Sequence, residues 1–315
     1  MFVYKILTLN MTWLCPVKCP YCHVERKASL KDDHYLDKAD LVRACKEALS
    51  LSFNEFRFSG GEPTSAGDKL FDYARTVFDI TGVKPSILTS GVYINENWIR
   101  KSSGLFSSIY ISVENPLHPF HEVVDVNLIL KYIKEYSSEE TPLRFGLTLV
   151  GPESYKNLFE IFESLYEGCG QKCWPQLTSP YLRSFVKPTK KELKALSVET
   201  QKIFRKYGAI PCYFLAFTGD KVFEKEHAYR QVANLNPDGS YEKFYSLKQL
   251  INHKKEKLNK SIKKRSTFCQ NCDWKDCCSP FSEDLELNMC ASYCDVRRAL
   301  FDGMLDGLEN AATAN

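Results

Sequence analysis

No apolar run in this 315-residue chain is long enough to cross a bilayer as a helix, so a membrane-spanning protein is not expected. The segment Met1–Lys5 does not follow the charged-then-apolar plan of a secretory signal, and we expect a cytoplasmic protein. Neither sign of charge dominates, because 42 lysines and arginines stand against 39 aspartates and glutamates, for a net charge of +3. That balance gives no reason to expect a nucleic acid as a general partner.

Cysteine, by contrast, is abundant, with thirteen residues in the chain. A reducing cytoplasm disfavours disulfides, and thiolates are soft ligands for iron and zinc, so metal or redox chemistry is indicated. With 44% hydrophobic and 13% aromatic residues, the chain can bury a large core. We expect one large domain over residues 1–208 and a smaller one over residues 209–315.

The densest cysteine motif is the run Cys15-Pro-Val-Lys-Cys19-Pro-Tyr-Cys22. Three thiolates spaced C-x3-C-x2-C on one loop can hold three irons of a [4Fe–4S] cluster, which leaves the fourth iron without a protein ligand. Such an open iron can bind a substrate or cofactor. The alternative is a structural zinc site, which needs four ligands, and only His23 lies near enough in sequence to be the fourth.

A second motif, Phe58-Ser-Gly-Gly-Glu-Pro63, follows a short alternating run that is typical of a strand. Its two glycines let a ligand approach the backbone closely, and Glu62 offers a carboxylate to an ammonium group. The two motifs, about forty residues apart, together resemble the radical S-adenosylmethionine (SAM) superfamily. The resemblance implies that the cysteine loop holds the cluster and that the open iron chelates the methionine part of SAM. It also implies that one turn binds the SAM amino group: Gly60, Gly61, Glu62 and Pro63.

Strand-like and helix-like segments alternate up to about Gly208, which is typical of a parallel sheet with crossover helices. The expected strands are Val3–Leu9, Glu55–Phe58, Pro85–Thr89, Ser108–Val113, Arg144–Val150 and Cys173–Ser179. Expected helices follow Asp37, cover Lys69–Ile80 and Asn95–Lys101, run to Tyr136 and to Gly168, and follow a capping box at Thr189–Glu192. Six such units predict a partial (β/α)6 TIM-like barrel, the form that the resemblance also implies. Active residues then belong at the carboxyl ends of the strands, where both motifs fall.

Other strand ends supply further candidate residues. The resemblance places SAM contacts near Ser90 and Ser112 and puts Tyr21 beside the adenine, although Ser90 stands where many relatives have asparagine. A solvated strand end is the structural alternative for both serines. His118 and His121 are candidate acid–base groups, since imidazole titrates near neutrality, or candidate ligands; the alternative is that they line a loop.

Cysteines gather again beyond Gly208, where the strand–helix alternation stops. Four soft ligands from this tail suffice for a closed cluster or a zinc site, and spacing alone does not choose between them. The tail resembles a SPASM-type auxiliary-cluster domain, an extension found on many radical SAM enzymes. The Asn236-Pro-Asp-Gly239 turn and the helical run Leu247–Ile251 occur in the order that this resemblance implies.

The tail also departs from a full SPASM domain, which usually carries two auxiliary clusters. Two positions where the first cluster usually has cysteine ligands hold Phe244 and Ser282 in this chain. Of that cluster's usual ligands, only one has an evident counterpart here, Cys212. We therefore expect one auxiliary [4Fe–4S] cluster. Its preferred ligands are Cys269, Cys272, Cys278 and Cys294, with Cys277 and Cys290 as alternates.

Some cysteines have other expected roles or none. Cys45 lies on the apolar stripe of the first helix and is expected in the core. Cys169 and Cys173, spaced C-x3-C, receive no role from the sequence. Cys212 is a candidate catalytic residue, because a weak S–H bond can return a hydrogen atom in an epimerase; the alternative is a buried strand residue.

The resemblance implies an enzyme that reductively cleaves SAM to a 5′-deoxyadenosyl radical, which removes a hydrogen atom from an unactivated C–H bond. The resemblance implies a peptide or protein side chain as substrate, which is cross-linked, epimerised or oxidised, and an electron donor such as flavodoxin or ferredoxin. Because the first strand is expected close to Met1, recognition of a leader peptide is expected to use a partner or the tail. The alternatives are a carbohydrate or other small-molecule epimerase or dehydrogenase, and a non-catalytic zinc-binding interaction protein.

Overall fold

The structure, a computed structural model, describes residues 4–17, 19, 22, 34–113, 124–149, 155–178, 188–207, 209–212, 215–218, 230–241, 244, 246–252, 299–300 and 302–303. Its strands are β1 (Tyr4–Asn10), β2 (Glu55–Ser59), β3 (Ser86–Thr89), β4 (Ser108–Val113), β5 (Leu143–Thr148), β6 (Gln176–Thr178), β7 (Ala209–Cys212), β8 (Leu215–Thr218) and β9 (Arg230–Leu235). Its helices are α2 (Lys38–Ser50), α3 (Asp68–Thr81), α4 (Glu96–Ser102), α5 (Val126–Tyr136), α7 (Leu158–Gly168) and α8 (Lys190–Tyr207), with a 3-10 turn, η1, at Pro63–Ala66.

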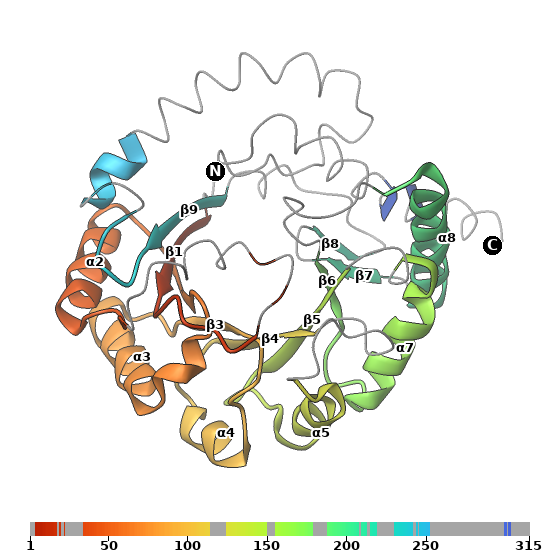
Figure 1. Cartoon of the computed structure of the whole chain (residues 1–315), viewed down its shortest axis with the longest axis horizontal. Coiled ribbons are helices and arrows are strands. Elements are labelled where there is room, and N and C mark those ends of the chain that lie inside the picture. The colour runs from red at the N-terminus through yellow and green to blue at the C-terminus, as the bar shows by residue number, and fades with distance from the viewer. Residues whose placement is uncertain are drawn as a thin grey trace.

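All of these strands belong to one sheet, in the order β8-β7-β6-β5-β4-β3-β2-β1-β9. Neighbouring strands are parallel except for the pair of β7 with β8. Figure 1 shows the strands along the inner side of an arc and the helices along its outer side. The arc is not closed within the described residues, since β8 and β9 are its two edges. The predicted partial TIM-like barrel is confirmed.

Local sequence signals fix where the helices begin and end. The Asp37 carboxylate accepts the Ala39 N–H at 2.7 Å and caps α2. The capping box before α8 forms in both directions: the Thr189 N–H donates to the Glu192 carboxylate at 2.7 Å, and the Glu192 N–H donates to the Thr189 hydroxyl at 3.3 Å. Gly168 is the last residue of α7, as the sequence predicted.

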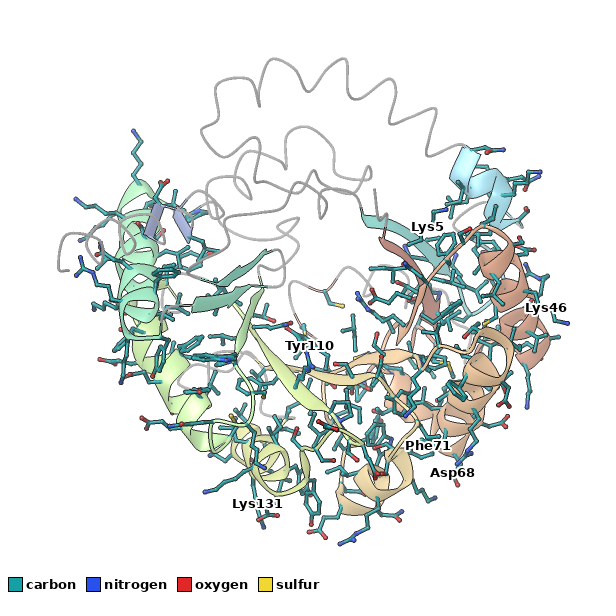
Figure 2. The ribbon with its side chains drawn as sticks, turned by 180° about the vertical axis from the view of Figure 1, so that it is seen from behind. Lys5, Lys46, Asp68, Phe71, Tyr110 and Lys131 are labelled. Carbon is teal, nitrogen blue, oxygen red and sulfur yellow. The ribbon has the colours of Figure 1, made fainter. Side chains whose placement is uncertain are left out.

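The sheet presents two different faces. Leu7 and Leu9 of β1 are buried in the core with α2 residues such as Ala44. Alternation along the strands therefore puts the intervening residues on the inner face of the arc. Tyr110 of β4 lies there (Figure 2), while labelled residues such as Lys131 lie on the outer helices. A methyl group at Gly146 of β5 would lie 1.8 Å from the Tyr110 hydroxyl oxygen, so this glycine makes room for the ring on the inner face.

Strands continue past Gly208, where the sequence analysis expected the alternation to stop. β7 and β8 extend one end of the sheet, and β9 pairs in parallel with β1 at the other end, from Tyr4↔Arg230 to Leu9↔Leu235. Short strands of ordinary composition give a weak sequence signal, which explains why these three were not expected. The division into two domains at residue 208 stays a prediction.

Helix α2 also holds the segment that follows β9. The Arg43 guanidinium donates to the Gly239 carbonyl at 2.6 Å and to the Asp40 carboxylate at 2.8 Å. The Glu47 carboxylate accepts the Leu247 N–H at 3.0 Å, at the start of the helical residues 247–252. A methyl group at Gly239 would lie 2.3 Å from an Asp40 carboxylate oxygen, so only glycine allows the turn to sit this close. The predicted helical run from Leu247 is confirmed.

Near the carboxyl terminus, Ala299 and Leu300 are buried. A methyl group at Gly303 would lie 2.2 Å from the Ser197 carbonyl oxygen, which places this helical turn directly against α8. None of the described helices combines the length and the hydropathy needed to cross a membrane.

Candidate active site

A ladder of backbone hydrogen bonds joins the start of the cysteine loop to the Gly-Gly-Glu turn. Its members are Met11 N–H to Ser59 O (2.9 Å), Gly61 N–H to Thr12 O (2.6 Å) and Glu62 N–H to Leu14 O (2.8 Å). The ladder continues the pairing of β1 with β2, whose last paired residues are Asn10 and Ser59. Two motifs that are far apart in sequence are therefore held together at the carboxyl edge of the sheet, where ligands bind in parallel α/β folds.

Both glycines of the turn are required by this close approach. Gly60 has φ +119°, which side-chain-bearing residues rarely adopt, and a methyl group there would lie 2.4 Å from the Thr12 carbonyl oxygen. At Gly61 a methyl group would lie 2.1 Å from the Leu14 carbonyl oxygen. The sequence interpretation was that the two glycines let a ligand approach the backbone closely, and this stays a prediction. In the structure, the backbone of residues 12–14 lies in the space that a side chain at either glycine would need.

Glu62 is fully buried, at 0% exposure, and its carboxylate accepts five hydrogen bonds. One oxygen accepts from Thr64 N–H (3.0 Å), Thr64 hydroxyl (2.6 Å) and Thr89 hydroxyl (2.6 Å). The other accepts from Ser90 N–H (2.8 Å) and Ser90 hydroxyl (2.5 Å). The carboxylate thus ties η1 to the end of β3, and its predicted contact with an ammonium group stays a prediction.

Ser90 therefore donates two hydrogen bonds to Glu62 in this structure, and its expected SAM contact stays a prediction. Sequence reasoning did not identify Thr64 or Thr89. A signal was present, because both are hydroxyl residues next to predicted turn or strand-end positions. A buried carboxylate needs such donors.

The three motif cysteines are all partly buried. The Cys22 N–H donates to the Cys19 carbonyl at 2.9 Å and closes a turn. Burial raises the pKa of the Cys15 thiol to about 11; the charges of Glu62 and Cys22 act in the same direction, and a hydrogen bond with the Val17 backbone opposes them. Within the described residues, no three cysteine, histidine or acidic side chains converge as closely as a bound metal ion requires.

The chemistry of the donor set nevertheless fits a [4Fe–4S] cluster. Three thiols lie on one loop at the ligand-binding edge of the sheet, and their number matches a cluster with one open iron. Iron would also offset the conditions that raise the pKa of Cys15, because a bound cation favours the thiolate. Cys15, Cys19 and Cys22 are the residues that would hold the group.

Of the remaining predicted site residues, the structure describes Ser112 and Cys212. Ser112 is exposed on β4, on the same face as Tyr110 and paired in register with Gly146. Cys212 is the last residue of β7 and pairs with Leu177 of β6. The following residues lie outside the described part of the chain: Tyr21, His23, His118, His121, Cys269, Cys272, Cys277, Cys278, Ser282, Cys290 and Cys294.

Residues 9–165 match the sequence model of the radical SAM superfamily. Residues 9–165 therefore carry a radical SAM superfamily domain. Members of this superfamily use SAM and a [4Fe–4S] cluster, as the two motifs predicted. The match covers the cysteine loop, the Gly-Gly-Glu turn and the sheet from the end of β1 to α7.

Curated proteins are similar to this chain over a short stretch. It is 33% identical over 96 residues to a PqqA peptide cyclase from Gluconobacter oxydans, covering 29% of this chain and 24% of the relative. It is 28% identical over 90 residues to a probable GTP 3′,8-cyclase from Saccharolobus islandicus, covering 29% of this chain and 28% of the relative. The matched region spans about a quarter of the length of these relatives.

Solved structures share the fold over more of the chain. The structure of anSMEcpe with bound AdoMet and Cp18Cys peptide superposes with a TM-score of 0.64 at 18% identity, covering 98% of this chain and 99% of the other. The structure of Streptococcus suis SuiB bound to precursor peptide SuiA has a TM-score of 0.57 at 15% identity, covering 76% of this chain and 59% of the other. At these identities the likeness establishes the radical SAM fold.

Proposed function

We propose that this protein is a radical SAM maturase, an enzyme that modifies a side chain of a peptide or protein by cross-linking, epimerisation or oxidation. When bound, the cluster and SAM supply a 5′-deoxyadenosyl radical that removes a hydrogen atom from the substrate. The observation that carries the proposal is the hydrogen-bonded ladder between the cysteine loop and the Gly60-Gly61-Glu62 turn, in a chain with a radical SAM domain.

The described residues divide the work of building this site. Cys15, Cys19 and Cys22 hold the iron. The ladder fixes the Gly-Gly-Glu turn beside their loop, and the buried Glu62 carboxylate fixes η1 and the end of β3 relative to that turn. Preorganisation of this kind lets a site bind its ligand without reordering its own backbone.

SAM contacts are proposed on three further residues by resemblance. Tyr21 is assigned to the adenine, and Ser90 and Ser112 to other parts of SAM. The exposure of Ser112 on β4, at the inner face of the arc, supports its assignment. Cys212 stays a proposed hydrogen-atom donor for an epimerisation outcome.

The likeness to peptide-processing proteins supports the substrate class. Both solved structures above contain peptides by their descriptions, and the Gluconobacter oxydans relative is a peptide cyclase by name. The radical chemistry consumes an electron, for which a flavodoxin or ferredoxin is the proposed donor. A cytoplasmic location is also proposed, because a reducing compartment keeps thiols available for metal and redox chemistry.

An auxiliary [4Fe–4S] cluster is proposed for the tail, on Cys269, Cys272, Cys278 and Cys294, with Cys277 and Cys290 as alternates. The attachment of the turn at Gly239 and of residues 247–252 to α2 supports a tail held against the barrel. The SAM-binding cluster and this auxiliary cluster together predict about eight irons per chain. Iron and sulfide analysis after anaerobic reconstitution measures this number, and about four irons would remove the auxiliary cluster.

Replacement of Cys15, Cys19 and Cys22 by alanine tests the central proposal. With dithionite and SAM, the variant should produce no 5′-deoxyadenosine above background, and it should lose about four irons while keeping the tail's iron. Cys45→Ala is the matched control, since Cys45 is a core cysteine of α2 with 0% exposure, and it should keep both iron and activity. Continued 5′-deoxyadenosine formation by the triple variant would contradict the proposal.

A second candidate function is the modification of a small molecule, such as a carbohydrate, by epimerisation or dehydrogenation. The matches to probable GTP 3′,8-cyclases favour this class, because the name of those relatives denotes a small-molecule substrate. Reactions in deuterated water with peptides and with sugars or nucleotides distinguish the two classes. A small molecule that gains one deuterium or loses two hydrogens, with every peptide unchanged, would replace the maturase proposal.

A further inference from the structure

A second group of thiols lies at the opposite end of the sheet from the cysteine loop. Cys169 directly follows α7, and Cys173 lies shortly before β6. Cys173 also interacts with the backbone of Phe145 and with the charge of Arg144, near the start of β5. The pair is therefore at the amino ends of β5 and β6, whereas the Cys15 loop follows the carboxyl end of β1.

The turn between the two cysteines brings their sulfur atoms together. Gly170 and Gln171 both have left-handed φ angles, +65° and +58°, and the Gln171 N–H donates to the Tyr166 carbonyl at 2.9 Å. This tight reversal puts the Cys169 sulfur 3.4 Å from the Cys173 carbonyl oxygen, and the two side chains form a hydrogen bond. Cys169 is fully buried and Cys173 is partly exposed.

The surroundings distinguish the two sulfurs. The hydrogen bond from Cys173 lowers the pKa of Cys169 to about 6, with help from the backbone N–H groups of residues 171–173, while burial opposes the decrease. The same hydrogen bond and burial raise the pKa of Cys173. A thiolate beside a protonated thiol is the arrangement that thiol–disulfide exchange uses, with one attacking and one resolving sulfur.

We propose that Cys169 and Cys173 are a redox-active dithiol that closes to an intramolecular disulfide by exchange with a low-molecular-weight disulfide. Cys173 is the sulfur that solvent can reach, and it attacks one sulfur of the small disulfide while its proton passes to the hydrogen-bonded Cys169. The S–S bond breaks, and the first small thiol leaves with that proton. The Cys169 thiolate then attacks the Cys173 sulfur, the mixed disulfide breaks, and the second small thiol leaves with a proton from water. The two cysteines are oxidised and one disulfide is reduced to two thiols.

This site is separate from the metal chemistry proposed above. Within the described residues, no third cysteine, histidine or acidic side chain joins the pair to complete a metal site. The proposal therefore does not depend on the proposed function, and its test reads the state of the sulfurs.

The sequence provides a direct assay, because trypsin cuts after Lys172, between the two cysteines. Iron-loaded protein is treated anaerobically with cystamine, blocked with iodoacetamide under denaturing conditions, and digested without reduction. The expected product is Asn157–Lys172 joined to Cys173–Arg183, about two mass units below the sum of the separate peptides. Cys45, buried and with its pKa raised to about 12, serves as the internal control and should be found alkylated.

Two variants assign the roles. Cys169→Ser should stop at a cysteamine adduct on Cys173, because the resolving thiol is absent. Cys173→Ser should form little adduct on Cys169, because the attacking sulfur is absent and Cys169 is fully buried. The proposal is overturned if the linked peptides do not form in the wild-type protein, or if the two cysteines are modified separately at the rate of Cys45.

Discussion

The two ends of the sheet hold cysteines in opposite electrostatic settings. At the carboxyl end, burial and the charge of Glu62 raise the pKa of Cys15 to about 11. At the amino end, hydrogen bonds from Cys173 and from the backbone lower the pKa of Cys169 to about 6. The protein therefore disfavours a thiolate in the loop assigned to iron and favours one in the pair that has no third ligand among the described residues.

This difference follows from what each site must supply. A metal ion brings its own positive charge and displaces thiol protons when it binds, so a metal site needs no hydrogen bonds that stabilise free thiolates. A thiol that attacks a disulfide has no such help and depends on its protein surroundings. A raised thiol pKa is thus compatible with metal binding, whereas a lowered one indicates exchange chemistry.

The largest expected effect comes from Glu62→Gln. Each carboxylate oxygen accepts one backbone N–H, from Thr64 or from Ser90, so either orientation of the amide turns its NH2 group against a backbone donor. We expect a loss of about 1.5–3 kcal/mol in the free energy of unfolding. Urea denaturation measures this loss, and 5′-deoxyadenosine formation should fall with it.

Glu199→Gln is the matched control for that prediction. Glu199 is also buried, at 7% exposure, but it accepts one backbone N–H, from Phe159, and a Lys202 ammonium that is half exposed. A glutamine can still accept the N–H while the lysine returns to water, so a loss below about 1 kcal/mol is expected. Equal losses in the free energy of unfolding for the two variants would show that the hydrogen-bond donors around Glu62 do not control its contribution to stability.

A somewhat smaller effect is expected from Gly61→Ala. The added methyl group would meet the Leu14 backbone, which cannot move without breaking the ladder, and we expect a loss of about 1–3 kcal/mol together with weaker iron retention. Gly168→Ala, at the other end of the sheet, would meet only the tip of the Leu130 side chain at 2.8 Å. That side chain can rotate, and alanine favours the helix, so stability should change by less than about 1 kcal/mol.

Urea denaturation and iron content are measured for both glycine variants. A Gly61→Ala protein that keeps its iron and its stability would mean that the turn and the cysteine loop are not held together by the ladder. A large loss in Gly168→Ala would mean that the amino end of the sheet is packed as tightly as the carboxyl end.

The framework of this fold could be predicted from sequence because its signals are local. Alternating strands, the Asp37 cap and the Thr189–Glu192 capping box each depend on a few adjacent residues, and all of them are present. β9 could not be predicted in this way, because its pairing with β1 joins residues about 226 positions apart, as Tyr4 with Arg230. Contacts of that range leave no periodic signal.

The candidate site shows the same division between local and long-range information. The cysteine spacing and the Gly-Gly-Glu-Pro turn identified the chemistry. The close approach that requires both glycines did not follow from the motif. It depends on the backbone of Thr12 and Leu14, which follow the end of another strand. The thiol pair Cys169 and Cys173 was visible as a spacing but received a role only when the left-handed turn and its hydrogen bonds were known.

The smallest expected effect is the response of the Cys169–Cys173 pair to alkaline pH. With the pKa of Cys169 lowered to about 6 by the hydrogen bond from Cys173, the pair has lost one of its two protons at neutrality, so the rate of linked-peptide formation with cystamine should fall below pH 6 and stay almost constant from pH 7 to pH 8. An ordinary thiol would become several-fold more reactive over that interval, since its pKa is about 8.5. The charged groups that face the pair are Arg144 beside Cys173 and Lys134 against Gly170. Quenched time courses at pH 6, pH 7 and pH 8 measure the rates. A rate that still rises steeply between pH 7 and pH 8 would show that the attacking sulfur is an ordinary thiol. The electrostatic contrast between the cysteines at the two ends of the sheet would then be removed.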